Sequence, residues 1–325
     1  MLPDIIIQLF AKTPRRPVSV WSLLRGKTTA SVLFAALEYD ILQWRKLLPN
    51  CTRSDFMTVI DGFIKRGFMT GDANNVALTS AGLAAQAAAT ARNPLPQQYQ
   101  YASNAPVFGD RLFLGVQVVS EALAGNNRYV PVTSDWQVQR WVRAWYAQVH
   151  ADLPAVATEL TTAFGQLPGA TADQLAAQLV GHDYNGQDVQ FTALQNLAAI
   201  SALAAIIAQQ PDTYPLLTAL WGGPRSLVSA NTLACVAQVE RHVPLADIAR
   251  MMRRKLSTVN EYVQVYAILV RPLTPALFLT ADQIATLQRT WAQGQRSYKE
   301  LLAAVPESDF VPVRIFQIWQ LRKEV

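Results

Sequence analysis

The side chains that usually carry out catalysis are few in this sequence and do not form a catalytic pattern. Its three histidines, His150, His182 and His242, lie far apart, and none belongs to the H-E-x-x-H spacing that puts two zinc ligands on one helix face. No G-x-S-x-G motif occurs to present a serine nucleophile. The acidic pair Asp183 and Asp188 lies in a Gly/Asn-rich stretch without the apolar surroundings that favour general acid–base catalysis. The sequence therefore predicts a protein that is not an enzyme and that holds no metal or cofactor.

The phrase RGKT at residues 25–28 resembles the end of a nucleotide-binding loop. The complete motif, G-x-x-x-x-G-K-[ST], needs its first glycine so that backbone amides can cradle phosphates. That position is Trp21 here, and the apolar spacing predicts a helix over residues 18–24. The sequence therefore predicts no ATP site at this phrase.

A basic cluster in the C-terminal third is the strongest indication of a binding function. The cluster consists of Arg250, Arg253, Arg254 and Lys255, and it is followed by the polar residues Ser257, Thr258, Asn260 and Gln264. Cations in a turn position a protein on phosphates, and short polar side chains at the start of a helix can reach base edges. We expect these eight residues to contact DNA. The alternative is a solvated basic turn on a packing module.

Three helices are predicted to position this cluster. The first covers residues 229–241, the chain restarts at Pro244, and the third is expected to be capped by Ser257 and buried through Val259. This order is typical of a trihelical helix-turn-helix, in which Arg253 occupies the place where the turn often has glycine.

The N-terminal region has the order of a winged-helix domain. A helix is predicted over residues 52–66, two short strands over 67–70 and 76–79, and a further helix after them. The turn at residues 71–75 contains Asp72 but no Lys or Arg, so packing or protein contact is as compatible with this module as DNA binding. A second set of candidate DNA-binding residues consists of Arg25, Lys27, Arg53, Lys65 and Arg66.

Composition and charge indicate three segments in a mainly α protein. The 325 residues are 51% hydrophobic with a net charge of +5, and alternating strand patterns are nearly absent outside the hairpin. Residues 1–100 carry eleven Lys and Arg against six Asp and Glu, residues 101–223 four against nine, and residues 224–325 thirteen against eight. We expect a winged-helix-like domain at 1–92, a helical connector or scaffold at 93–223, and a helix-turn-helix domain at 224–325. The acidic middle favours protein contact, including self-association, over duplex DNA.

The same sequence predicts a soluble, cytoplasmic protein. Cys51 and Cys235 are too far apart in sequence to suggest a disulfide framework or a metal motif, which fits a reducing compartment. The apolar run at 197–208 is shorter than the roughly 18 residues that a membrane span needs. The apolar stretch at 5–10 is too short for the core of a signal peptide.

Both ends of the chain also resemble a known family. The run SVWSLLRGKTTASVLFAALEYDI resembles the N-terminal region of the YpbB proteins, bacterial partners of RecQ-type helicases. The runs TLACVAQVERHVPLADIARMMRRKLSTVNEYVQVYAIL and VPESDFVPVRIFQIWQLRKE are similar to the C-terminal helix-turn-helix of that family and its closing helix. The chain departs from the family at Arg241 and His242, which occupy the usual glycine turn.

The resemblance implies a non-catalytic accessory protein of a RecQ-type helicase in DNA repair or recombination, placed on DNA by the helix-turn-helix. Such a protein binds DNA mainly through the backbone and with a strong dependence on salt. Two other functions fit the same residues. A helix-turn-helix transcription regulator would prefer one duplex site, and a protein-interaction scaffold would not bind DNA.

Overall fold

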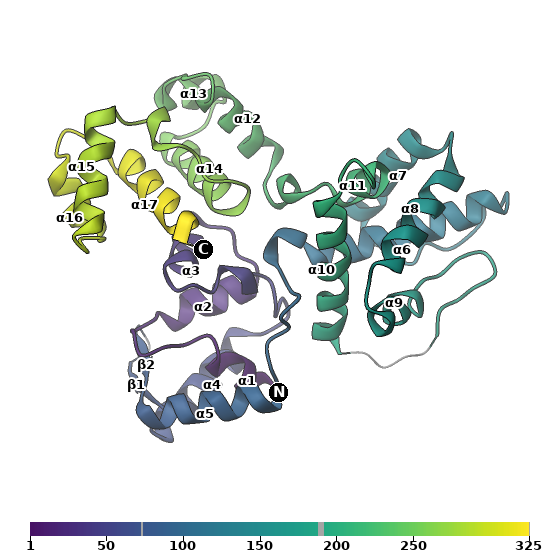
Figure 1. Cartoon of the computed structure of the whole chain (residues 1–325), viewed down its shortest axis with the longest axis horizontal. Helices are drawn as coiled ribbons and strands as arrows, with labels where there is room; N and C mark the ends of the chain where they lie inside the picture. The colour runs from purple at the N-terminus through teal and green to yellow at the C-terminus, as the bar shows by residue number, and fades with distance from the viewer. Residues whose placement is uncertain (73, 188–191, 325) are drawn as a thin grey trace. The chain divides into compact units, whose positions relative to one another are not determined.

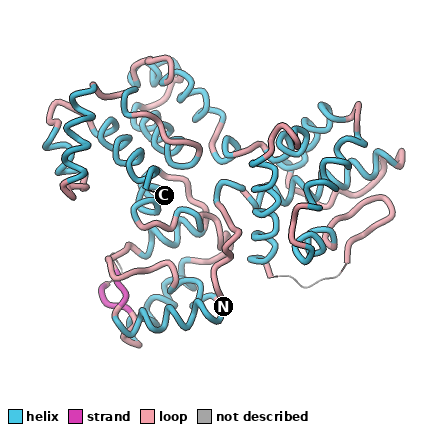
Figure 2. The backbone as a smooth tube through the Cα atoms, viewed as in Figure 1, coloured by secondary structure: helices cyan, strands magenta, loops and turns pink. Residues whose placement is uncertain are grey.

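Helices make up nearly all of the regular structure, and the strands are confined to one small antiparallel sheet (Figure 1). The structure is a computed structural model that describes residues 1–72, 74–187 and 192–324. Figure 2 shows the strands as a short segment in an otherwise helical and loop backbone. The prediction of a mainly α protein is therefore confirmed. No helix in the described part of the chain is long and apolar enough to cross a membrane.

The chain divides into two compact units. The terminal unit contains residue 2 with residues 6–87 and 227–325, and the middle unit contains residue 1 with residues 3–5 and 88–226. The expected domain boundaries at 92 and 223 lie within a few residues of these divisions, but both ends of the chain belong to a single unit. Whether the two ends also fold independently, as three domains would, stays a prediction.

The N-terminal part of the terminal unit places a small hairpin between two helices. Its elements are α2 (Pro17–Leu24), α3 (Ala30–Glu38), the 3-10 turn η1 (Leu42–Trp44), α4 (Arg53–Lys65), β1 (Met69–Gly71) and β2 (Val76–Leu78), while α1 (Leu2–Ile7) and α5 (Ser80–Arg92) have residues in both units. Thr52 caps α4 by accepting a hydrogen bond from Asp55 N–H at 3.1 Å. β1 pairs antiparallel with β2, with Met69 opposite Leu78. Arg15 forms an additional antiparallel bridge to Val76, which the sequence did not predict.

The C-terminal part of the terminal unit is helical throughout. Its elements are α12 (Ala230–Val239), α13 (Leu245–Met251), α14 (Leu256–Leu269), the turn η4 (Pro275–Leu277), α15 (Ala281–Ala292), α16 (Tyr298–Ala304) and α17 (Phe310–Glu324). Ser229 caps α12 by accepting from Thr232 N–H. α14 packs against α12, α13, α17 and α3, so the second half of α14 is buried on every side. Trp291 and Phe316 join a further apolar cluster among α15, α16 and α17.

The middle unit is a helical bundle around α6. Its elements are the turn η2 (Tyr101–Ser103), α6 (Ala105–Leu123), α7 (Trp136–Val149), α8 (Leu153–Gly165), α9 (Gly169–Ala176), α10 (Ala193–Gln209) and α11 (Pro215–Trp221), and the turn η3 (Pro224–Leu227) follows at the boundary. Gly109 of α6 lies so close to Ile200 of α10 that an added Cβ would stand 2.5 Å from Ile200 Cδ1. The absence of a side chain at Gly109 thus permits the close approach of α6 and α10.

Candidate nucleic-acid interface

The turn after α13 is fixed by backbone hydrogen bonds. Arg254 N–H donates to Ala249 O at 2.9 Å, and Arg253 N–H donates to Arg250 O at 3.1 Å. This pair of bonds is the Schellman pattern, which requires a left-handed residue just beyond the helix. Arg253 occupies that position with a φ of 52°. The order of the motif in the sequence places Arg253 at the glycine position of the turn, and the backbone there has the left-handed conformation that glycine adopts most easily.

The turn between α12 and α13 repeats this arrangement with another residue. Val243 N–H donates to Gln238 O at 3.1 Å and His242 N–H donates to Val239 O at 2.9 Å. His242 has a φ of 60°, so the dipeptide Arg241-His242 supplies the left-handed residue where the similar family has glycine. At the ends of both α12 and α13, backbone hydrogen bonds therefore hold a residue other than glycine in the left-handed conformation.

All four cations of the predicted cluster are exposed, Arg250 in the last turn of α13 and the other three in the turn after it. Arg253, Arg254 and Lys255 follow one another on the surface, and Arg250 forms an ion pair with Asp247 one turn earlier in α13. The Arg250 side chain is 81% exposed, so this pair can exchange for a contact with another anion at little expense. The turn therefore presents a compact positive surface on a fixed backbone.

The predicted cap of α14 is wrong by two residues. Lys255 is the N-cap with an extended backbone, and no side chain caps the helix at this end. Ser257 lies inside the first turn instead, because the Schellman turn brings the chain into the helix immediately after Arg254. Ser257 is exposed, whereas Thr258 is half-buried.

The polar side of α14 faces α3 within the terminal unit. Glu261 Oε1 accepts a hydrogen bond from Ala30 N–H, at the first turn of α3, at a distance of 3.2 Å. Gln264 is buried and donates to Asn260 O at 2.9 Å. A cavity of about 650 Å³ lies here and is lined by Ser257, Asn260 and Gln264 from α14, by Ala30 and Phe34 from α3, and by Arg314 from α17. The structure thus places three of the four predicted base-reading residues, Ser257, Asn260 and Gln264, around a cavity of the protein itself, while Thr258 does not line it.

Arg314 belongs to this contact and was not predicted. Its Nε and Nη1 are buried without a hydrogen-bond acceptor, and its guanidinium stacks on the ring of Phe34 at 3.6 Å. Burial lowers the pKa of Arg314 and raises the pKa of Glu38, whose carboxylate faces it from α3. Attraction to aromatic faces takes the place of missing hydrogen bonds. Arg314 therefore holds α17 to α3.

The second set of candidates is exposed but dispersed over several elements. Arg25 and Lys27 follow α2, Arg53 begins α4, and Lys65 and Arg66 end it. Arg66 donates through Nε to Gly62 O at 3.1 Å and lies 5.1 Å from the ring centroids of Phe63 and Phe68. Arg25 lies 3.4 Å from Cys51 O. No single loop collects these cations as the turn after α13 does.

In the hairpin turn, two backbone amides donate hydrogen bonds to a side chain of the same turn. Asp72 Oδ1 accepts from Asn74 N–H at 2.7 Å and from Asn75 N–H at 3.0 Å. These bonds lower the pKa of Asp72, so the turn carries a negative charge. A phosphate would meet that charge instead of free amides, which strengthens the argument against DNA contact here.

Of the other titratable side chains considered from the sequence, His182 lies beside acidic groups, with its Nε2 4.0 Å from Asp183 Oδ1. His182 Nδ1 lies 2.9 Å from Glu121 Oε2, whereas His150 and His242 are exposed in other elements. Asp183 is exposed, and Asp188 lies outside the described residues. Cys235 is buried, and burial raises the pKa of its thiol to about 11. Among the described residues, no three His, Cys, Asp or Glu side chains gather to hold a metal ion.

One signal in the sequence could have revealed the contact between α3 and α14. From Val263 to Leu269 every residue of α14 is buried. A helix that is apolar all round must be covered by several neighbours, more than a trihelical module provides. The sequence shows the need for another partner but does not identify α3.

Comparison with known proteins gives one similarity. Protein YpbB of Bacillus subtilis (strain 168) is 27% identical to this chain over 139 residues, which are 41% of this chain and 39% of that protein. The chain thus spans well under half the length of the relative it matches. No family model matches the chain, and no solved structure matches it.

Proposed function

We propose that this chain is a non-catalytic accessory protein that binds DNA through the phosphate backbone, using the turn after α13. The observation that carries the proposal is the placement of four exposed cations, Arg250 in the last turn of α13 and Arg253, Arg254 and Lys255 in the turn of fixed backbone that follows it. Cations held on a rigid turn contact phosphates with little loss of conformational freedom.

The face that α14 presents to α3 favours backbone contact over base reading. Asn260 and Gln264 would have to enter the major groove in a sequence-specific complex. Gln264 is buried, and Glu261 is held at the start of α3. A regulator that reads one operator would need these residues free, so the arrangement supports sequence-independent binding instead.

The resemblance of both ends of the sequence to the YpbB proteins, as partners of RecQ-type helicases, is the basis on which we propose a RecQ-type helicase as the partner. In this role the protein would hold DNA near the helicase while the helicase performs the ATP-dependent work. Its DNA affinity would be moderate and strongly dependent on salt, because each neutralised phosphate releases counterions.

Two double variants test the DNA contact. Arg254→Ala with Lys255→Ala should weaken binding to random-sequence duplex and reduce the slope of log K against log salt by about 1.8, since each lost phosphate contact contributes about 0.9. Arg289→Ala with Lys299→Ala removes two exposed cations from α15 and α16 of the same unit and should change neither quantity by much. Fluorescence anisotropy at several salt concentrations, on duplex, forked and single-stranded DNA, measures both.

The alternatives predict different results in the same assay. Equal losses of DNA affinity in the two double variants would mean that binding depends only on the net charge of the protein. The assignment of the DNA contact to the turn after α13 would then be wrong. A marked preference for one duplex sequence would favour a transcription regulator. No binding to any DNA at low salt would leave a protein-interaction scaffold, and binding to purified RecQ-type helicase would then be measured without DNA.

A further inference from the structure

The middle unit contains an open groove that takes no part in the proposed DNA contact. The groove has a volume of about 440 Å³ and lies among α6, α7 and the loop 124–135 that connects them. Leu114 and Val118 of α6 and Val142 of α7 give it an apolar lining, together with the rings of loop residues Tyr129 and Pro131. Its size and lining are those of a site for one or two apolar side chains.

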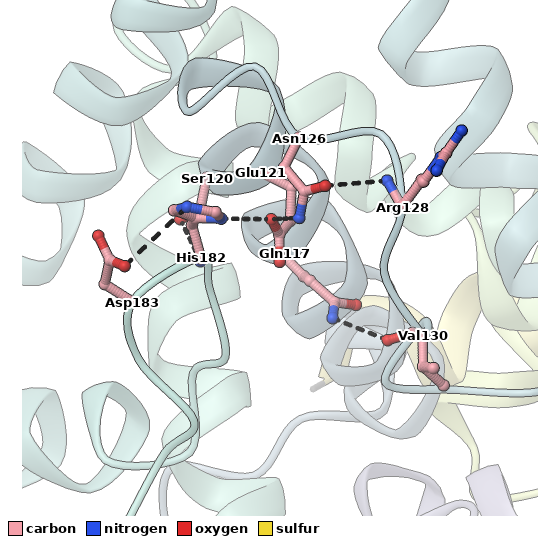
Figure 3. Close-up of polar contacts among 8 residues, drawn as sticks. All are labelled: Gln117, Ser120, Glu121, Asn126, Arg128, Val130, His182 and Asp183. Carbon is pink, nitrogen blue, oxygen red and sulfur yellow. Dashed lines mark hydrogen bonds and ion pairs between the residues drawn. The ribbon is translucent and has the colours of Figure 1, made fainter.

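The loop that borders the groove is held in place by buried side chains of α6. Gln117 donates through Nε2 to Val130 O at 3.0 Å and accepts from Val132 N–H at 2.9 Å. Glu121 accepts from Asn126 Nδ2 at 2.6 Å and from the His182 ring, and Figure 3 shows its carboxylate between those two residues. Because Gln117 and Glu121 are both buried, the loop cannot swing away without breaking these bonds. The groove is therefore formed before a partner arrives, which lowers the ordering cost of binding.

Positive charge on residues 101–223 gathers beside this groove. The segment has four cations and nine acids. Arg111 is buried, with its guanidinium 3.6 Å from the Trp141 ring centroid and donating to Trp221 O. The other three, Arg128, Arg140 and Arg143, are exposed, and they belong to the loop and to α7, the elements that border the groove. Arg143 lines the groove directly.

The acids closest to these arginines in sequence already have partners. Glu121 pairs with Asn126 and His182, as described above. Asp135 caps α7 by accepting from Gln137 N–H at 2.8 Å and Val138 N–H at 3.3 Å. The described structure shows no ion pair from Arg128, Arg140 or Arg143 to a carboxylate, so their charge is available to a ligand.

We propose that the groove docks a short acidic peptide of a partner protein. One or two apolar side chains of the peptide enter the groove, and its carboxylates pair with Arg143, Arg140 and Arg128. Exposed apolar side chains next to the groove extend the contact surface: Leu123 is 53% exposed, Val130 86% and Trp136 64%. Charge-assisted pairs with arginine then orient the peptide.

The surrounding charge favours a peptide over a nucleic acid. A nucleic acid carries a phosphate at every nucleotide, so its strand would pass beyond three arginines onto a segment in which acids predominate. A peptide with two or three carboxylates needs only the arginines themselves. The inference does not depend on the proposed DNA function, because all of its residues lie in the other unit.

An array of short synthetic peptides tests the proposal on the full-length chain. Each peptide has one or two Phe, Leu or Trp residues flanked by Asp or Glu, and a matched set has Asn or Gln in place of the acids. Fluorescence polarisation then gives the dissociation constant of each bound peptide. We expect acidic members to bind with constants below about 100 µM and the matched amide set to bind at least about tenfold more weakly.

Variants locate the bound peptide. Arg143→Glu should weaken binding about tenfold, whereas Arg225→Glu reverses an exposed charge of the same unit outside the groove and should leave binding unchanged. Val118→Gln, at a half-buried groove position, should also weaken binding while circular dichroism shows an intact fold. The proposal is overturned if no acidic peptide binds, if the amide set binds equally well, or if Arg225→Glu has the same effect as Arg143→Glu. It is equally overturned if oligothymidylate binds through Arg143 and no peptide does.

Discussion

Arg253 combines a backbone conformation that disfavours it with a side chain that the proposed function requires. A left-handed backbone costs an ordinary residue about 1–2 kcal/mol, and glycine escapes most of that penalty. The Schellman bonds of Arg253 and Arg254 hold the turn in this conformation all the same. If phosphate contact is the function of this turn, an arginine at position 253 provides a cation there but leaves the folded state less stable than a glycine would.

The first prediction at this scale separates those two contributions. Arg253→Gly should raise the free energy of unfolding of the terminal unit by about 1 kcal/mol, because it removes the clash of Cβ at a φ of 52°. Arg253→Ala should give no such gain, since alanine keeps Cβ. Urea denaturation measures the stabilities, and both variants should lose DNA affinity equally because both lose the same charge. A gain in Arg253→Ala as large as that in Arg253→Gly would contradict the backbone argument.

His182 gives a second prediction at the scale of the residue. Its hydrogen bond with Glu121 raises the pKa of His182 above the ordinary value of 6.5 and lowers that of Glu121 below 4.5. The pair thus contributes its full stability to the middle unit between pH 4.5 and pH 6.5, the two ordinary pKa values. This contribution is lost as pH rises through the raised His182 pKa or falls through the lowered Glu121 pKa.

An NMR titration of the His182 ring protons checks this pair. Glu121→Gln should return the pKa of His182 towards 6.5, and it should also remove the loss of stability that the pair produces as pH rises above 6.5 through the raised His182 pKa. His150, which is exposed in another element, serves as an internal reference in the same spectra. An unchanged His182 titration in Glu121→Gln would show that the contact is not formed in solution.

Two glycines in neighbouring helices show what decides stability at the scale of the element. Gly82, in the first turn of α5, lies so close to the hairpin that an added Cβ would stand 1.9 Å from Phe68 O. Gly62, in α4, has nothing within 4 Å of that position. In the helix interior alanine is favoured over glycine by about 1 kcal/mol. The effect of an alanine on stability should therefore be set by packing at Gly82 and by helix propensity at Gly62.

We predict opposite effects for the same substitution in the two helices. Gly82→Ala should destabilise the terminal unit by about 1–3 kcal/mol, because a backbone carbonyl cannot move aside as a side chain can. Gly62→Ala should stabilise it by up to about 1 kcal/mol. Thermal or urea unfolding of both variants decides the matter, and a neutral Gly82→Ala would mean that α5 is not seated against Phe68 as described.

Local elements of this protein were more predictable than the contacts between them. The cap at Thr52, the hairpin and the left-handed position of Arg253 all follow from residues within a few places of each other. The contact of Glu261 with Ala30 joins residues 231 positions apart, and no local pattern specifies such a partner. The polar residues of α14 were assigned to DNA for this reason, although Gln264 is buried inside the terminal unit.

The whole molecule joins its two basic ends in one unit. α3 packs on both α14 and α17, and Arg314 stacks on Phe34 across that contact. A fragment of residues 227–325 would expose the surfaces of α14 and α17 that α3 covers. We expect this fragment to unfold at lower urea concentration than the full chain, and to be restabilised when a fragment of residues 1–92 is added. An isolated fragment as stable as the terminal unit of the full chain would show that the expected three-domain division holds for folding.

Because the chain is synthesised from its N-terminus, the division into units also determines which unit can fold first. The middle unit is almost continuous in sequence from residue 88 to residue 226, so all of it has been synthesised before residue 227 is added. The terminal unit must wait, because Glu261, which accepts from Ala30 N–H at the start of α3, lies 231 positions after Ala30, and Arg314, which stacks on Phe34, lies further along the chain still. Domains generally fold as units in the order in which they emerge. The face of α3 that packs on α14 and α17 therefore stays uncovered until those two helices have been synthesised, after the whole of the middle unit.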